Sequence, residues 1–198
     1  CFAIQVSEKY NVRQKYIERT NILCTQFFSD EGCFEILDFM PRYHTANNQY
    51  YTPPEIYRYI RPINGKPRFH VHYNPAFNYA RDQIFHKSYD DYIKTYSTKD
   101  EKDNLFLYAS IDYNAILERR EVTLVQEEFF LLSYYQKLLP IDIERVYLEY
   151  QRTKVYWLNW DNRSKRYKTY NSIISRSLLT LKIMSFQESG AAVAAITT

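Results

Sequence analysis

Glycine is scarce in this sequence, and its scarcity excludes one common kind of site. Only 3 of the 198 residues are glycine, where ~7% is usual in soluble proteins. Neither GxGxxG nor GxxxxGK[ST] occurs, so the glycine-rich loops that hold nucleotide phosphates are absent from the sequence. We therefore expect no cofactor.

A strong net charge and long apolar runs are missing as well. The 26 Lys and Arg residues nearly balance the 23 Asp and Glu residues, which leaves a net charge of +3. This charge is too small to indicate binding to nucleic acid or to a membrane surface. No apolar run approaches the ~20 residues that a membrane-spanning helix needs. We expect neither nucleic acid nor a membrane as a partner.

Cysteine is too rare to build a disulfide framework or a zinc site. The three cysteines are Cys1, Cys24 and Cys33, an odd number without the CxxC spacing of zinc ligands. Cys24 and Cys33 flank a predicted hairpin turn at residues 29–32, which would place Cys33 opposite Phe28. Reduced thiols are typical of the cytosol, so the sequence predicts a cytoplasmic protein with no metal site.

Aromatic residues, in contrast, are abundant, with 21 Tyr and 12 Phe. Such residues favour β-strands, and 45% hydrophobic residues suffice for a sizeable core. Strand-like runs occupy residues 22–28, 33–39, 56–63, 68–73, 105–111, 122–125 and 129–135. Asn64-Gly65 predicts a hairpin turn between two of these runs, and residues 41–54 read as a loop. The pattern predicts a mainly β fold, an antiparallel β-sandwich.

Two helices are predicted after residue 140. Asp142 is positioned to cap the first, and Asn171 the second, with Gly190 beyond its end. The predicted buried stripes are Ile143, Val146, Tyr147, Tyr150, Trp157 and Leu158 in the first helix, and Ile174, Ser177, Leu178, Leu181 and Met184 in the second. Two helices cannot cover both stripes alone. We therefore expect a larger helical domain to begin here, and residues to be missing at both ends of the chain.

The histidines offer one arrangement that could hold a metal. His70 and His72 share one face of a predicted strand, but no third ligand has a clear spacing. His44 and His86 are isolated in loop-like sequence. A solvated or half-buried position is expected for all four.

No group of residues forms a convincing catalytic constellation. Neighbouring strand residues point to opposite faces, so neither Asp90-Asp91 nor Glu127-Glu128 makes an acid/base pair. Ser110 and Ser133 lack a GxSxG context. We therefore assign a catalytic role to none of these residues, and the substrate-binding residues are unknown from the sequence.

Two further features could touch a ligand but favour simpler interpretations. A basic cluster consists of Arg163, Lys165, Arg166 and Lys168. It could meet phosphate, but a solvated loop or an interdomain contact is the favoured interpretation. Trp157 and Trp160 flank the end of the first predicted helix. They could form a platform for a sugar, but packing between the β domain and the helices is favoured.

Short segments between residues 16 and 198 form an ordered pattern. They are residues 16–23 (YIERTNIL), 34–41 (FEILDFMP), 57–61 (YRYIR), 65–69 (GKPRF), 75–81 (PAFNYAR), 156–160 (YWLNW), 176–182 (RSLLTLK) and 190–198 (GAAVAAITT). In this order they resemble the N-terminal part of glycoside hydrolase family 15, the prokaryotic glucoamylase-like and trehalase-like enzymes. Asn78, Ala80 and Ile196 depart from the Asp, Gly and Pro of the family motifs.

The resemblance implies a domain organisation. Residues 1–140 would form the N-terminal β-sandwich (supersandwich-like), with its opening strands missing before Cys1. Residues 141–170 would form a helical linker. Residues 171–198 would contain the first helix of a truncated (α/α)6 barrel, against which the sandwich packs.

The resemblance also implies a chemistry. The parent enzyme would hydrolyse α-glucosidic bonds with inversion, using one glutamate as acid and a second as base. Both glutamates would lie beyond Thr198, so this piece alone would be inactive, and its α-glucoside substrate would be bound by the missing barrel. Thr197 and Thr198 approach the expected rim of that site and receive no role.

An alternative function belongs to a different class. The chain could be a stand-alone β-sandwich carbohydrate-binding or interaction module that stacks glycans on surface Tyr and Trp without catalysis. Nucleic-acid binding through interleaved Tyr, Lys and Arg is a third reading, which the near-neutral charge disfavours.

Overall fold

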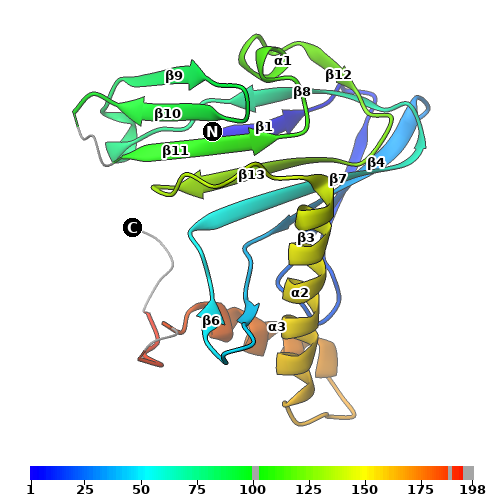
Figure 1. The fold of residues 1–198 in the computed structure, drawn as a ribbon. Helices are drawn as coiled ribbons and strands as arrows, with labels where there is room; N and C mark the ends of the chain where they lie inside the picture. Colours follow the sequence, from blue (N-terminus) through cyan, green and yellow to red (C-terminus); the bar gives the residue numbers. More distant parts are fainter. Residues whose placement is uncertain (100–102, 187–188, 194–198) are drawn as a thin grey trace.

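The computed structural model describes residues 1–99, 103–186 and 189–193, and its main feature is a pair of antiparallel sheets (Figure 1). The larger sheet has eight strands in the spatial order β2–β3–β4–β7–β13–β11–β10–β9. Their bounds are β2 (Asn11–Tyr16), β3 (Leu23–Ser29), β4 (Gly32–Phe39), β7 (Glu55–Gly65), β9 (Ile84–Ser88), β10 (Ile93–Ser97), β11 (Asn104–Ala109) and β13 (Glu128–Tyr134). The smaller sheet has the order β1–β8–β12, with bounds β1 (Phe2–Gln5), β8 (Arg68–Tyr73) and β12 (Glu121–Thr123).

The remaining elements are short or lie at the ends of the sheets. A two-stranded hairpin consists of β5 (Tyr43–His44) and β6 (Tyr50–Tyr51). The helices are the 3-10 turn η1 (Asn78–Ala80), α1 (Tyr113–Leu117), α2 (Ile143–Asn162) and α3 (Asn171–Ile183). In Figure 1, α2 leaves the end of β13 and runs down from the larger sheet, with the β5–β6 hairpin and α3 beside its lower part.

One hydrophobic core fills the space between the two sheets. Phe34 stacks on Phe27 with ring centroids 4.5 Å apart and on Phe69 of the smaller sheet at 5.6 Å. Phe69, Val71 and Tyr73 face this core from β8, as the alternation of that strand predicts. Two antiparallel sheets packed over a shared core agree with the predicted mainly β, sandwich-like fold.

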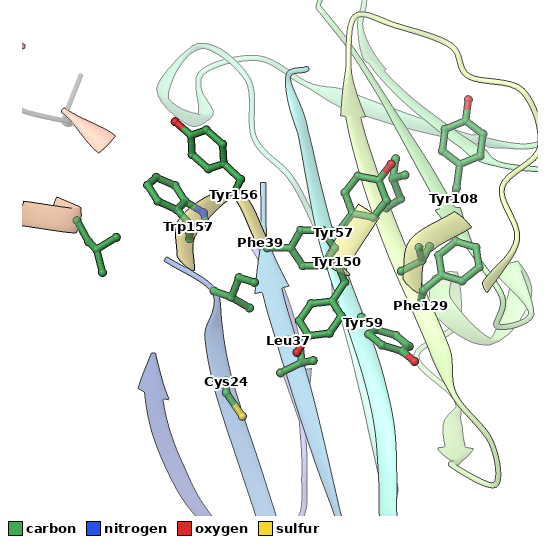
Figure 2. Close-up of a cluster of buried hydrophobic side chains, with 14 of the residues drawn as sticks. Cys24, Leu37, Phe39, Tyr57, Tyr59, Tyr108, Phe129, Tyr150, Tyr156 and Trp157 are labelled. Atoms are coloured by element: carbon green, nitrogen blue, oxygen red, sulfur yellow. The ribbon is translucent and has the colours of Figure 1, made fainter. Parts of the chain in front are cut away.

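A second core covers the other face of the larger sheet (Figure 2). Phe39 stacks on Tyr57 at 5.2 Å, and Tyr150 of α2 approaches both Phe39 and Tyr59 at 6.0 Å. The middle of the sheet is therefore buried on both faces. This explains why β4 and β13 contain adjacent buried residues, such as Ile36-Leu37 and Phe129-Phe130, instead of a strict alternation.

The prediction of a hairpin at Asn64-Gly65 is wrong. β7 pairs with β4 and β13, whereas β8 pairs with β1 and β12 in the other sheet. A two-residue type I′ turn needs positive φ at both positions, but of these two residues only Gly65 has it (φ 67°). Gly65 lies opposite Gly32, and Lys66 N–H donates to Glu31 O at 3.0 Å, so the chain leaves the larger sheet there.

Several other strand boundaries differ from the sequence prediction. Residues 41–54 are not wholly a loop, because they contain the β5–β6 hairpin. β1, β2, β9 and β10 were not predicted. In β2 and β9 most residues are exposed and many are polar, which dilutes the apolar signal. The tight turn at residues 29–32 is confirmed: Phe28 lies opposite Cys33, and Cys24 lies opposite Leu37. All three cysteines are free thiols.

The first predicted helix is confirmed and the second is partly wrong. Asp142 caps α2 by accepting from Arg145 N–H at 2.8 Å, but Tyr147 of its predicted stripe is exposed. Asn171 is the first residue of α3 and accepts from Tyr167 N–H instead of capping the helix.

The predicted buried stripe of α3 and its predicted end are also partly wrong. The buried residues of α3 are Ser175 and Leu179, whereas Ser177 and Leu181 are exposed. The helix ends at Ile183, well before Gly190. Hydrogen bonds made by Ser175 and Arg176 determine which side of this helix faces the protein.

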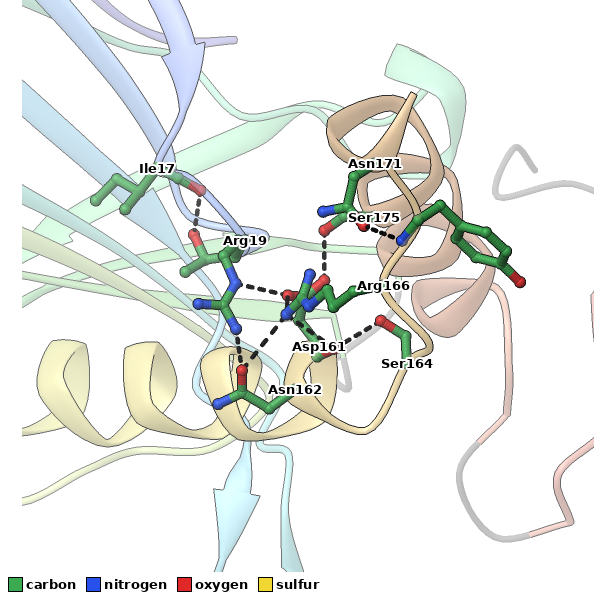
Figure 3. Close-up of polar contacts among 10 residues, drawn as sticks. Ile17, Arg19, Asp161, Asn162, Ser164, Arg166, Asn171 and Ser175 are labelled. Atoms are coloured by element: carbon green, nitrogen blue, oxygen red, sulfur yellow. Dashed lines mark hydrogen bonds and ion pairs between the residues drawn. The ribbon is translucent and has the colours of Figure 1, made fainter. Parts of the chain in front are cut away.

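A fully buried carboxylate joins three segments that are distant in sequence (Figure 3). Asp161, near the end of α2, accepts from Arg19 Nε and from Arg166 at 2.6 Å each, and from the hydroxyl of Ser175 in α3. Burial would raise the pKa of Asp161, but the bonds from Ser175, Arg19 and Arg166 outweigh it and hold the pKa below its usual range. The carboxylate is therefore charged at neutral pH and fixes the junction.

A second set of bonds attaches α3 to the turn between β2 and β3. Arg176 donates to Thr20 O at 2.8 Å and to the side chain of Asn21. Asn21 in turn donates to Leu179 O at 3.1 Å. Residues 16–23 and 176–182, which are two of the segments in the family resemblance, thus contact each other.

We predict that Gly65→Ala destabilises the protein more than Gly190→Ala. Both glycines have positive φ (67° and 73°), but a Cβ at Gly65 would lie 2.5 Å from Glu31 O, whereas nothing lies within 4 Å at Gly190. Backbone strain alone costs about 1–2 kcal/mol, and the added clash costs about 1–3 kcal/mol more. Chemical denaturation measures both variants, and equal losses would contradict the close approach of β4 and β7.

We predict that Asp161→Asn lowers the free energy of unfolding by about 3–5 kcal/mol at pH 7, because it leaves two arginines without their buried counter-ion. Glu118→Gln, which breaks an exposed ion pair with Arg120, is the control and should cost less than about 1 kcal/mol. A lowered folded-state pKa gives stability that is present above the unfolded value of ~3.9 and lost as pH falls through the folded value. The difference in stability between the two proteins should therefore begin to shrink as the pH falls below about 4; a difference that is constant down to pH 2 would contradict the charge argument.

Candidate functional site

The candidate site is an open cleft between the β5–β6 hairpin and α2. It has a volume of about 730 Å³, within the ~300–1,000 Å³ typical of small-molecule sites. Its lining combines aromatic rings with polar groups. The lining residues are Tyr43, His44, Thr45, Ala46, Tyr50, Tyr51, Gln151, Arg152, Val155, Tyr156, Asn159, Trp160 and Arg163.

The hairpin forms one wall of the cleft through cross-strand ring pairs. Tyr43 stacks on Tyr51 with centroids 4.8 Å apart, and His44 lies 4.0 Å from Tyr50. The hairpin turn is closed by Thr45 N–H, which donates to Gln49 O at 2.8 Å, and by a left-handed Asn48 (φ 58°). Asn tolerates this conformation better than most residues, so the local sequence favours the turn.

The opposite wall is one face of α2. Arg152, Tyr156, Asn159 and Arg163 follow one another at intervals of three and four residues, so their side chains share a face of the helix. Tyr156 lies 6.2 Å from His44 and 6.4 Å from Tyr50 between ring centroids, which closes the base of the cleft.

Two buried glutamates accept hydrogen bonds near the hairpin, and one of them, Glu149, holds the hairpin on the helix. Glu149 of α2 accepts from the Tyr43 hydroxyl at 3.0 Å and from Arg152 at 3.2 Å. Glu55, at the start of β7, accepts from the Tyr57 hydroxyl at 3.0 Å. Burial, together with the nearby charge of Glu149, raises the pKa of Tyr43 to about 12, and burial raises the pKa of Glu55. These tyrosines stay protonated and donate to the carboxylates.

This carboxylate pair is not an open acid/base site. Glu55 is 1% exposed and Glu149 is 4% exposed. Glycoside hydrolysis needs two carboxyl groups that reach the bond from opposite sides of the sugar. Glu55 and Glu149 lie inside the fold and accept from protein donors, so Glu149 positions the hairpin and Glu55 bonds Tyr57 within β7.

The two tryptophans pack against one core but differ in exposure. Trp157 is buried in the core over the larger sheet, as the packing interpretation expects. Trp160 is half-buried: it packs against the same core and also lines the cleft. His44 also lines the cleft, a position that no pattern in the sequence predicted.

The other histidines lie elsewhere. His70 and His72 are half-buried on the face of β8 that points away from the core, opposite Gln5 and Ala3 of β1. His86 Nδ1 lies 2.9 Å from the Thr95 hydroxyl, and burial lowers the pKa of His86. Within residues 1–99, 103–186 and 189–193, no three metal-ligating side chains come together.

The two serines that the sequence considered have structural partners. Ser110 Oγ accepts from Phe129 N–H at 2.8 Å, and Ser133 Oγ donates to Gln136 O at 2.7 Å. Asp90 and Asp91 are exposed, and so is Glu127, whereas Glu128 is half-buried in β13. None of these residues lines the cleft.

The residues of the basic cluster have different surroundings in the structure. Arg166 binds Asp161, and Lys165 lies over the ring of Tyr167 at 5.7 Å. Arg163 lines the cleft. Thr197 and Thr198 lie outside the described residues.

Sequence reasoning missed the cleft because it read residues 41–54 as a loop. A usable signal was present: Tyr43-His44 and Tyr50-Tyr51 flank Asn47-Asn48, which is two aromatic pairs around a turn. The helical periodicity of α2 would then have supplied the second wall.

We predict that Glu149→Leu releases the β5–β6 hairpin, because the Tyr43 hydroxyl and Arg152 lose their buried acceptor. The expected cost is about 1–3 kcal/mol, and hydrogen exchange of the Thr45 and Asn48 amides should accelerate at least tenfold. Glu149→Gln keeps an acceptor oxygen and should exchange nearly as slowly as the parent. Unchanged exchange in the leucine variant would show that Glu149 does not hold the hairpin.

Comparison with known proteins gives two similar chains. One is a trehalase of Thermoplasma acidophilum, 29% identical over 213 aligned residues, which cover 99% of this chain and 34% of the trehalase. The other is a trehalase of Thermoplasma volcanium, 26% identical over 205 aligned residues, which cover 99% of this chain and 32% of the trehalase. The chain thus spans about a third of the length of the curated relatives it matches.

No protein-family model matches the sequence, and no solved structure matches it. Among the helices of the described residues, none is long and apolar enough to cross a membrane. Over nearly its whole length, the chain is similar to a segment of proteins named as trehalases.

Proposed function

We propose that residues 1–198 are the N-terminal portion of a glycoside hydrolase that acts on α-glucosidic bonds, trehalase-like or glucoamylase-like, as the resemblance to glycoside hydrolase family 15 implies. The observation that carries the proposal is the similarity to two trehalases over 99% of the chain. The order of the motifs in the sequence and the antiparallel sandwich also support it.

In this proposal the chain divides into three parts. Residues 1–140 form the sandwich, residues 141–170 the linker, and residues 171–198 contain the first helix of an (α/α)6 barrel. The catalytic glutamates lie beyond residue 198, so the 198-residue chain alone does not turn over substrate. The burial of Glu55 and Glu149 supports this division, since neither is placed to protonate a glycosidic oxygen.

The proposal assigns the exposed apolar residues of α3 to contact with the rest of the catalytic barrel. Ile173 and Leu181 are 63% and 59% exposed, on the side of α3 away from Leu179. Ile183, one turn beyond Leu179, is 40% exposed. Phe186 and Val193 follow and are also exposed. A run of exposed apolar residues on one helix is typical of an interface, and the sandwich would thereby support the barrel instead of binding the reacting bond.

We predict that the natural protein containing this chain releases glucose from trehalose or maltose, and that residues 1–198 alone do not. Inversion makes the stereochemical prediction specific. Cleavage of α,α-trehalose should give α-glucose and β-glucose in a 1:1 ratio at early times, because attack by water inverts only one anomeric centre. Proton NMR of the first turnovers measures the ratio.

Each outcome has a distinct meaning. A product that is entirely α-glucose would overturn inversion, and turnover by residues 1–198 alone would overturn the placement of the glutamates. No hydrolysis of any α-glucoside by the natural protein would overturn the proposed function.

A further inference from the structure

We propose that the cleft between the β5–β6 hairpin and α2 binds the pyranose ring of a neutral saccharide. This goes beyond the proposed function, which places the reacting bond in another part of the protein. The inference stands on the geometry of the cleft, and the proposed function contributes only the choice of glucosides as probes.

The aromatic lining matches one side of a pyranose ring. A pyranose carries its hydroxyls around the rim, and its faces present C–H groups that pack on the electron-rich face of an aromatic ring. Tyr50 and Tyr156 meet at an interplanar angle of 76° with centroids 6.4 Å apart, and Trp160 lies on the same helix one turn beyond Tyr156. The rings thus form a corner in place of a flat surface.

The polar lining matches the other requirement, which is to bond hydroxyl groups. Gln151 and Asn159 each carry an amide that both donates and accepts, as a sugar hydroxyl does. Arg152 is held by Glu149 at 3.2 Å, and its guanidinium also lies over the ring of Tyr43 at 5.3 Å. Because the protein already positions this group, little side-chain freedom is lost on binding.

The charge of the cleft favours a neutral ligand. Arg152 forms an ion pair with the buried Glu149, so its charge is compensated. Arg163 is the other cationic residue of the lining and is exposed. An anion would gain mainly from the charge of Arg163, which is worth little in water, whereas a neutral sugar can use the aromatic corner and the amides together.

The test follows the indole N–H resonance of Trp160 in the natural protein that contains this chain. Trp160→Phe assigns the resonance, since it is the peak that disappears. Titration with methyl α-D-glucopyranoside, which also avoids turnover of an α-linked disaccharide, should shift this peak saturably. Sorbitol, which has hydroxyls but no ring face, should not shift it. An absent shift, or equal shifts with both compounds, would overturn the inference.

A pair of variants ties the binding to the cleft. Val155→Glu places a charge in the lining at an exposed helix position and should weaken binding at least tenfold. Leu148→Glu makes the same change at an exposed position of α2 outside the lining and should leave binding unchanged. Equal affinity in Val155→Glu and the parent would place the site elsewhere and overturn the inference.

Two further arms separate this inference from its alternatives. Glucose 6-phosphate that binds where the methyl glucoside does not would overturn the neutral ligand in favour of an anionic one. If the protein hydrolyses trehalose but its Trp160 peak never shifts, sugar binding in the cleft is overturned and the proposed function stands. A saturable shift in a protein that hydrolyses no α-glucoside would overturn the proposed function alone.

Discussion

The burial of both faces of the eight-stranded sheet is the constraint on which the rest of the structure depends. One face is covered by β1, β8 and β12, which the chain reaches by leaving the larger sheet at Gly65. The other face is covered by α2. A helix of 20 residues is ~30 Å long, and its first half contacts the sheet at Val146 and Tyr150. The second half extends past the sheet, so it needs other partners, and the β5–β6 hairpin and α3 supply them.

Buried carboxylates fix those partners in place. Apolar contacts tolerate a range of positions, but a buried charge is stable only where its donors reach it. Asp161 binds Arg19, which lies 142 residues earlier in the chain, and Glu149 binds Tyr43, 106 residues earlier. Each carboxylate therefore specifies one docking position, the first for α3 and the second for the hairpin. The hairpin held by Glu149 forms one wall of the cleft, and α2, which carries both carboxylates, forms the other.

The sequence predicted elements whose signals are local. The cap at Asp142, the turn at residues 29–32 and the alternation of β8 each depend on a few neighbouring residues, and all are confirmed. The sequence-based prediction failed where contacts between residues distant in sequence determine the structure. Asn64-Gly65 has the composition of a hairpin turn, yet the packing of Phe69 on Phe34 draws β8 into the other sheet. The buried side of α3 is set by Arg176 and Ser175, whose partners Thr20 and Asp161 no periodicity identifies. The cleft was missed for the same reason, since its walls lie about a hundred residues apart.

The abundance of tyrosine follows from this architecture. A sheet buried on both faces needs large side chains, and a tyrosine adds a hydroxyl that can join two segments within the core. Tyr73 bonds Thr95 at 2.8 Å, and Tyr108 bonds both the N–H and the carbonyl of Leu138. These rings are committed to the fold. Tyr50 differs, because 40% of it is exposed and it lines the cleft. Composition alone cannot separate the two uses, since the distinction lies in whether the aromatic face is covered by protein or open to a ligand.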